Sequence, residues 1–172
     1  LEKKRINPYP HKFEFKDYSD DIKEKHKKLK DNERSKSKVI VAGRVMLIRN
    51  LGKLIFSTIQ DSKGKLQLIL QKGETEKEDF ELFKKYIDVG DFVGAKGKVM
   101  KTRTEVVAVL VKKIKILSKS LLPLPEKFHG IVDKEERYRK RYLDLIMNPE
   151  VKDVFEKRAI ILDCIRELLK KK

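Results

Sequence analysis

The sequence predicts a mainly β domain, a small closed barrel, flanked by helices at both ends. Three observations indicate this class. Strand-like runs follow one another between residues 39 and 117, with turn sequences between them. A single helical pattern interrupts these runs after the third one, and further helical patterns stand before and after the strand-rich segment.

The first three strands are predicted to form an antiparallel meander. Residues 39–49 are rich in β-branched and aliphatic side chains and end at a turn, Asn50-Leu51-Gly52, that leads into a second run over 54–61. Another turn, Ser62-Lys63-Gly64, precedes a third run over 65–70.

A change of periodicity then predicts one short helix over 78–87. Phe80, Phe83 and Tyr86 recur at helical spacing, and Thr75 and Glu78 have the form of a capping box, in which both side chains bond backbone amides at the helix start. Two more strands follow, over 92–100 and 106–117. This order matches the five-stranded Greek-key barrel called the OB-fold, although a generic small barrel would give a similar order.

Helices are predicted on both sides of the barrel. Before it, Tyr18, Ile22 and His26 have helical spacing, with Ser19 as a candidate cap and lysines over the remaining surface. After it, Asn148 and Pro149 are suited to start a helix with one apolar stripe. Such a stripe is either buried or, without a cover, exposed, self-associating or frayed. The stripe consists of Val151, Val154, Phe155, Ile161, Ile165 and Leu168.

Charge favours a polyanionic partner. The 172 residues include 43 Lys and Arg against 27 Asp and Glu, a net charge of +16, and residues 37–132 hold 19 basic against 10 acidic residues. No apolar run is long enough to span a bilayer and no leader opens the chain, so we expect a cytoplasmic protein without a membrane partner. The single cysteine, Cys164, and three scattered histidines indicate no metal site.

No complete active site is recognisable, so we expect no catalytic residues in this chain. The run Gly94-Ala95-Lys96-Gly97-Lys98 lacks the spacing of a phosphate-binding loop and is interpreted as a strand with close-packed glycines. No Ser, Cys or His stands in a nucleophile motif.

Strand alternation places Phe56 on the more polar face of the second strand, opposite to Ile55, Ser57 and Ile59. Gln67 and Lys65 share one face of the third strand. An aromatic ring beside amide and cationic side chains is suited to stack on unpaired bases and to read their edges. Alternatively, Phe56 packs under a loop or against the 78–87 helix.

The segment 121–146 closely resembles the linker of class II lysyl-tRNA synthetases. It contains a Pro-x-Pro pair, Phe-His-Gly, Arg-Tyr-Arg-x-Arg-Tyr and Tyr-Leu-Asp-Leu-Ile in one frame, with Leu122 where the family usually has Arg. The resemblance implies four parts: an N-terminal extension with a basic helix (1–36), an OB-fold anticodon-binding domain (37–120), the linker (121–147) and the start of the catalytic domain (148–172).

The strand segment is similar to the anticodon-binding barrel of the same family. The resemblance implies that Phe56 stacks on an anticodon base and that Arg49 and Gln67 bond uridine edges. Lys53 and Lys65 are expected to contact phosphates. A family Glu follows Thr-Gly in the last turn; here Glu105 stands at the Gly position, so it either replaces that Glu after a one-residue shift or the contact is absent.

The resemblance implies the tRNA-binding portion of an enzyme that attaches lysine to its tRNA with ATP and Mg²⁺, whose two catalytic motifs lie beyond residue 172. It also implies a homodimer joined through the C-terminal helix, and an N-terminal helix that either is simply solvated or extends the tRNA contact. Two alternatives remain: a free-standing OB-fold protein that binds tRNA or single-stranded RNA, and a dimerisation or docking module.

Overall fold

The computed structural model describes residues 6–125, 131 and 133–171, and it divides the chain into two compact units, Leu1–Pro123 and Leu124–Lys172. The first unit holds all the described strands and two helices, and the second holds three helices. Each is described by itself. Residues 126–130 and 132 of the predicted linker lie outside the described residues.

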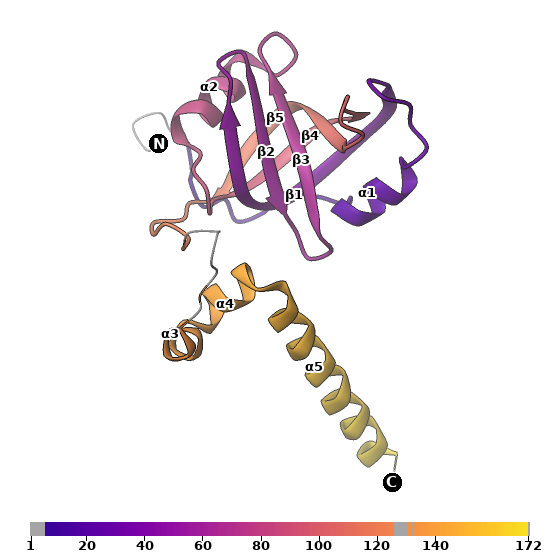
Figure 1. The fold of residues 1–172 in the computed structure, drawn as a ribbon, viewed down its shortest axis with the longest axis vertical. Coiled ribbons are helices and arrows are strands. Elements are labelled where there is room, and N and C mark those ends of the chain that lie inside the picture. The colour runs from indigo at the N-terminus through magenta and orange to yellow at the C-terminus, as the bar shows by residue number, and fades with distance from the viewer. Residues whose placement is uncertain (1–5, 126–130, 132, 172) are drawn as a thin grey trace. The chain divides into compact units, whose positions relative to one another are not determined.

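Five strands form a closed barrel with the neighbour order β1-β2-β3-β5-β4 (Figure 1). All neighbouring pairs are antiparallel except β3 and β5, which are parallel. The predicted five-stranded architecture is therefore confirmed. The strands are β1 (Arg34–Asn50), β2 (Leu54–Gln60), β3 (Lys65–Gln71), β4 (Phe92–Lys101) and β5 (Val107–Ser118).

Strand β1 begins at Arg34, earlier than the apolar pattern predicted. Its first half pairs with β4, from Arg34↔Met100 to Arg44↔Phe92, and its second half pairs with β2 as far as Asn50. The early residues are Lys- and Ser-rich, so they carry no strand signal of their own, and pairing with β4 gives them extended backbone. One long strand thus borders two different parts of the barrel wall.

Alternation along the strands sorts core from surface as expected. On β2, Ile55, Ser57 and Ile59 are buried and the residues between them are half-buried. On β3, Leu66, Leu68 and Leu70 are buried, whereas Lys65 is exposed. Because the side-chain period of a strand is two residues, one face of each strand fills the barrel and the other forms its outer surface.

Helix α2 (Lys77–Tyr86) covers part of the barrel with Phe80 and Phe83, both buried. The predicted capping box is wrong: Glu76 is the N-cap and no side chain caps the helix. Thr75 is itself buried, and its Oγ1 donates to the carbonyl oxygen of Val111 at 2.7 Å. The hydroxyl is therefore used to satisfy a strand carbonyl instead of a helix amide.

Helix α1 (Ser19–Lys25) lies on the other side of the strands from α2 in the view of Figure 1. Tyr18 is its N-cap, so the predicted Ser19 cap is wrong. The backbone N–H and the hydroxyl of Ser19 both donate to the carboxylate of Asp61, at 2.7 Å each, which joins the helix to the turn between β2 and β3. Ile22 and His26 face inward and are buried.

The Lys96-Gly97-Lys98 run lies within β4, and its glycine is closely packed, as predicted. A Cβ atom on Gly97 would lie 2.2 Å from the carbonyl oxygen of Leu110, closer than side-chain carbons approach backbone oxygens. Only glycine therefore lets β4 and β5 approach at this point. The run builds barrel wall, and no described helix begins directly after it to form a phosphate-binding loop.

The second unit contains α3 (Lys134–Arg139), α4 (Arg141–Met147) and α5 (Pro149–Lys170). Asp144 is buried and accepts hydrogen bonds from Arg137, Arg141 and Asn148. Burial raises the pKa of Asp144, but the bonds from Asn148 and Arg137 outweigh this and hold it below its ordinary value. Asn148 is the N-cap residue of α5, as predicted, yet its side chain bonds Asp144 and does not cap the helix.

Among the described helices, none combines the length and the apolar character needed to cross a membrane.

Candidate nucleic-acid interface

Arg49, Phe56 and Gln67 come from three neighbouring strands and meet on the outer face of the barrel. Arg49 on β1 pairs directly with Phe56 on β2, and Phe56 pairs with Ile69 on β3. Gln67 lies two residues before Ile69, on the same face of β3, opposite Thr58. Register therefore brings the three predicted contact residues within two adjacent rows of side chains.

These three side chains line one groove of about 820 Å³, which we call the aromatic groove. Its walls come from β1, β2 and β3, from the turn between β4 and β5, and from Asn32, which precedes β1 and has a positive φ of 60°. The other lining residues are Leu47, Leu51, Leu54, Thr58, Ile69, Gln71, Met100, Thr102, Arg103 and Thr104.

The ring of Phe56 belongs to the outer surface. Phe56 is half-buried and packs with Leu54 and Met100 against a small apolar cluster of Ile69, Ala108 and Leu110. The side chains of α2 belong to a different cluster, the core inside the barrel. The position of Phe56 thus matches the exposed-face interpretation, with an apolar seat that holds the ring while one part of it stays accessible.

Lys53 and Lys65 are exposed, but neither lines the aromatic groove. Lys53 lies in the turn between β1 and β2, where its carbonyl oxygen accepts from the backbone N–H of Lys72. Lys65 begins β3 opposite Gln60. It lies two residues before Gln67, on the same face of the strand. Both are thus placed as flanking charges of the kind that meet a phosphate backbone.

Glu105 lies in the turn between β4 and β5 with a positive φ of 60°. Its side chain is exposed and does not line the groove, whereas Thr102, Arg103 and Thr104 do. A left-handed residue in a tight turn is usually Gly or Asn, because a Cβ crowds the following carbonyl. Glu105 therefore has a backbone conformation that glycine adopts more readily.

Arg103, the second cation of the aromatic groove, was not among the binding residues predicted from the sequence. Its place in a Thr-Arg-Thr turn between two strands predicts an exposed cation, which Arg103 is. Its groove partners on β2 and β3, however, lie between 32 and 49 positions away along the chain, from Gln71 to Leu54. Only barrel closure brings the turn beside them.

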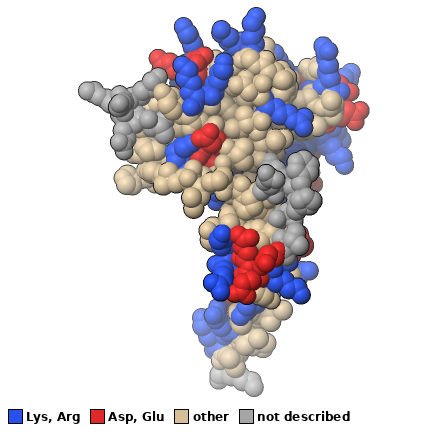
Figure 2. Space-filling view, turned by 60° about the vertical axis from the view of Figure 1, so that its left-hand side comes forward, with Lys and Arg blue, Asp and Glu red and all other residues tan. Residues whose placement is uncertain are grey.

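Lys and Arg side chains project around the edge of the strand-containing unit, with smaller groups of Asp and Glu beside them (Figure 2). Several acidic residues of this unit are paired within it, as in Asp21 with Lys63 at 2.7 Å and Glu74 with Arg34 at 2.8 Å. The excess positive charge is thus available to a partner.

Comparison with known proteins agrees with this geometry. Residues 39–117 match the family model described as the tRNA anticodon OB-fold nucleic acid binding domain. This segment is an OB-fold nucleic acid binding domain. The matched residues run from the first half of β1 to the end of β5, and they include Arg49, Phe56 and Gln67.

Curated relatives extend the similarity over nearly the whole chain. The chain is 43% identical over 169 residues to a lysine–tRNA ligase of Methanoculleus marisnigri, covering 98% of this chain and 33% of the relative. It is 44% identical to those of Thermosipho africanus and Halalkalibacterium halodurans, in each case covering 98% of this chain and 34% of the relative. The chain thus spans about a third of the length of the relatives it matches.

These matches confirm the predicted relationship to lysyl-tRNA synthetases and the OB-fold prediction. The OB-fold domain described above therefore matches the tRNA anticodon domain model, and the chain as a whole is similar to about a third of a lysine–tRNA ligase. The roles of individual residues stay predictions.

Proposed function

We propose that this chain is the tRNA-binding portion of a lysine–tRNA ligase and that its aromatic groove recognises the lysine anticodon. One observation carries the proposal: Arg49, Phe56 and Gln67, on three strands, share a single groove of an OB-fold nucleic acid binding domain. The second and third strands of an OB-fold commonly form the face that binds oligonucleotides.

Each side chain has a distinct task in this proposal. The half-exposed ring of Phe56 offers a stacking surface for one unpaired base. Gln67 presents both a donor and an acceptor to a base edge, and Arg49 presents donors only, which suits the carbonyl oxygens of uridine. Thr58, Thr102 and Arg103 add hydroxyl and cationic contacts from the rim.

The parent reaction is the ATP-dependent attachment of lysine to its tRNA, and ATP and Mg²⁺ belong to that reaction. The catalytic residues for this reaction would lie outside this chain. The enzyme would act in the cytoplasm, where it meets its tRNA. We expect the isolated chain to bind lysine tRNA without charging it. An ATP–pyrophosphate exchange assay with lysine checks this, and measurable exchange would contradict it.

The anticodon proposal is tested with two RNA stem-loops, one carrying the lysine anticodon and one with its uridines replaced. The wild-type chain should prefer the first. Arg49→Gln should remove much of that preference, since it removes donors aimed at the base edges. Lys115→Gln is the matched control: it removes one positive charge, and Lys115 is exposed on β5 outside the aromatic groove.

The outcome separates this proposal from a general RNA-binding protein. Equal affinity for both stem-loops, unchanged by Arg49→Gln, would show that the chain binds single-stranded RNA without reading the anticodon. Equal losses in Arg49→Gln and Lys115→Gln would assign the effect to net charge alone.

A second proposal concerns α5, whose apolar residues are uncovered in the single chain. Val154, Ile161 and Leu168 are 60–67% exposed, and Leu162 and Leu169 extend the stripe beyond the residues that the sequence singled out. Exposed apolar surface of this extent favours association. We infer that this stripe packs against a second copy in the parent homodimer.

Sedimentation of the chain over a concentration series tests the dimer. Ile161→Asp should shift the equilibrium toward monomer, whereas Lys152→Gln, which makes the same change in charge on the opposite side of the helix, should have a smaller effect. A wild-type chain that stays monomeric at all concentrations would contradict the proposal for this chain.

A further inference from the structure

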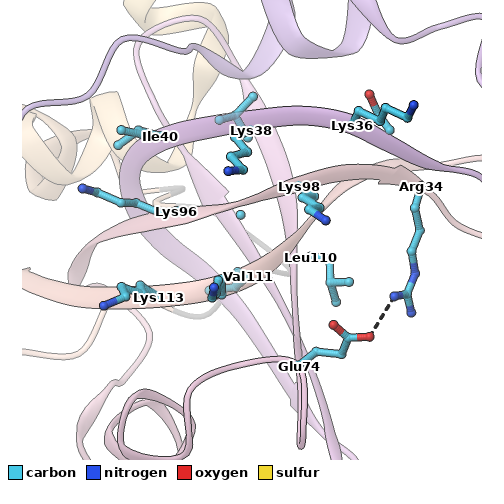
Figure 3. A pocket seen from close by; sticks show the side chains of 14 residues that line it. Arg34, Lys36, Lys38, Ile40, Glu74, Lys96, Lys98, Leu110, Val111 and Lys113 are labelled. Atoms are coloured by element: carbon cyan, nitrogen blue, oxygen red, sulfur yellow. Dashed lines mark hydrogen bonds and ion pairs between the residues drawn. The ribbon is translucent and has the colours of Figure 1, made fainter.

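A second groove, with a volume of about 660 Å³, lies on the first half of β1 and on β4 and β5. We call it the lysine groove. Its lining includes seven Lys or Arg residues and a single acid, Glu74. Figure 3 shows cationic side chains standing on neighbouring strands, with Glu74 reaching across to Arg34.

The register places like charges directly opposite one another. Lys38 on β1 pairs with Lys98 on β4, and Lys96 on β4 pairs with Lys113 on β5. Like charges in direct cross-strand pairs destabilise a sheet, because their side chains lie only about 4.5 to 5.5 Å apart at Cβ. In the described part of the chain no ion pair offsets this repulsion at Lys38, Lys96 or Lys98, and such a cluster suits an anionic ligand.

Internal neutralisation covers only the edge of the groove. Arg34 is paired with Glu74 at 2.8 Å, and Lys113 is paired with Glu76 at 3.2 Å. Within the described part of the chain, no carboxylate forms an ion pair with the other five cations, all of which are exposed: Lys36, Lys38, Lys96, Lys98 and Lys112.

The chemistry of the lining decides the kind of ligand. The uncharged part of the lining includes Gly97, Leu110 and Val111, and the lining contains no aromatic ring and no Asn or Gln. The groove therefore has neither a stacking surface nor an amide to read base edges, unlike the aromatic groove. Ammonium groups on neighbouring strands suit a row of phosphates whose bases are turned away.

We propose that the lysine groove binds the phosphate backbone of base-paired RNA. In a duplex the bases are stacked inside and the phosphates are outside. A site without base-reading groups therefore forgoes no available base contact when it binds a duplex. The inference goes beyond the proposed anticodon function, because it assigns to the other half of β1 an RNA contact that is independent of sequence.

The test compares two triple variants of the full chain that lose the same charge. K38Q/K96Q/K98Q removes three of the seven cations of the lysine groove, and K77Q/K84Q/K85Q removes three exposed lysines of α2 that line neither groove. Binding to a 20-base-pair RNA duplex without a loop is measured by anisotropy over a salt series. The groove variant should lose about tenfold in affinity at 0.1 M salt, and its log–log salt slope should fall by about 2 to 3.

The control triple should change affinity less than the groove triple does. K38R/K96R/K98R keeps the charge and should bind as the wild type does. Equal losses in the groove triple and the control triple would overturn the proposal, since net charge alone would then explain binding. Binding of the wild type to phosphatidylserine vesicles but not to the duplex would overturn it as well.

Thermal melting gives a second, independent readout. Since K38Q/K96Q/K98Q relieves like-charge pairs, its Tm should equal or exceed that of the wild type. A Tm lower by more than about 4 °C would show that the lysines stabilise the fold, and it would overturn the argument that they are kept for a ligand.

The two proposals fail separately. Phe56→Ala should weaken binding of the lysine anticodon stem-loop and leave duplex binding unchanged, whereas the groove triple should weaken binding of the duplex. If the groove triple leaves duplex binding unchanged while Phe56→Ala still weakens stem-loop binding, only the lysine-groove proposal is overturned. If Phe56→Ala leaves stem-loop binding unchanged while the groove triple still weakens duplex binding, only the anticodon proposal is overturned.

Discussion

The aromatic groove and the lysine groove are built on the two halves of one strand, β1, and they differ in chemistry. Arg49 lies in the second half, beside Phe56 and Gln67, where β1 pairs with β2. Lys38 lies in the first half, where β1 pairs with β4 and faces Lys98. One groove offers a ring, an amide and donors, and the other offers charge.

This difference separates specificity from affinity. Side chains that stack on bases and bond their edges discriminate between sequences, whereas lysines that neutralise phosphates contribute affinity that depends on salt and not on sequence. A barrel that presents both surfaces can hold an RNA at two places and read it at one of them. The predictions below test that division.

The largest effect should come from the core that supports both grooves. Phe83 is 1% exposed inside the barrel, so Phe83→Ala should cost about 3 to 5 kcal/mol of unfolding free energy through lost packing and a cavity. Binding at both grooves should fall together, in proportion to the unfolded fraction. Chemical denaturation beside RNA titration checks this, and a loss confined to one groove would contradict it.

Phe56→Ala should separate the aromatic groove from the fold. We expect a loss of about 1 to 3 kcal/mol in binding of the lysine anticodon stem-loop, because a stacking surface is removed. Phe56→Tyr should lose less, since it keeps a ring face. Melting is measured in parallel: a collapse of the Tm with binding intact in the folded fraction would show that Phe56 is a packing residue.

Gln67→Ala should act on discrimination more than on affinity. Removing one hydrogen bond to a base edge should cost about 0.5 to 1.5 kcal/mol with the lysine anticodon and little with an altered one. Titration of both stem-loops measures the ratio. A uniform loss on both would place Gln67 among the sequence-independent contacts instead.

Lys53→Gln and Lys65→Gln should weaken RNA binding in a salt-dependent way, as the lysine-groove variant does, but by a smaller amount. Each should flatten the log–log salt slope by about 0.7 if it removes one phosphate contact to a single strand. Preference among anticodons should stay as in the wild type. A salt slope equal to that of the Lys115→Gln control would show that neither lysine meets the RNA.

The smallest effect is expected at Glu105. Glu105→Gly relieves the left-handed backbone but adds freedom to the unfolded chain, so the net gain should be about 0.5 kcal/mol. Melting measures this gain. Unchanged RNA binding in the same variant would show that the family's Glu contact is absent here, and a clear loss would show that the carboxylate of Glu105 replaces it.

Periodicity in the sequence was enough to predict the strands, the helix after β3 and the outward face of Phe56. Each of these depends on neighbours a few residues apart, and alternation or helical spacing records them directly. The caps were wrong at Thr75 and Ser19, because the competing acceptors, Val111 and Asp61, are distant in sequence and only packing brings them close.

By itself, the sequence determined the order of the elements, the relationship to lysyl-tRNA synthetases and the outward face of Phe56 and Gln67. The tertiary structure decided what barrel closure creates: Arg103 beside Phe56, and Lys38 opposite Lys98 and Lys96 opposite Lys113. In the sequence these lysines are a diffuse charge excess. Strand register turns them into one groove, because cross-strand neighbours are set by pairing and not by position along the chain.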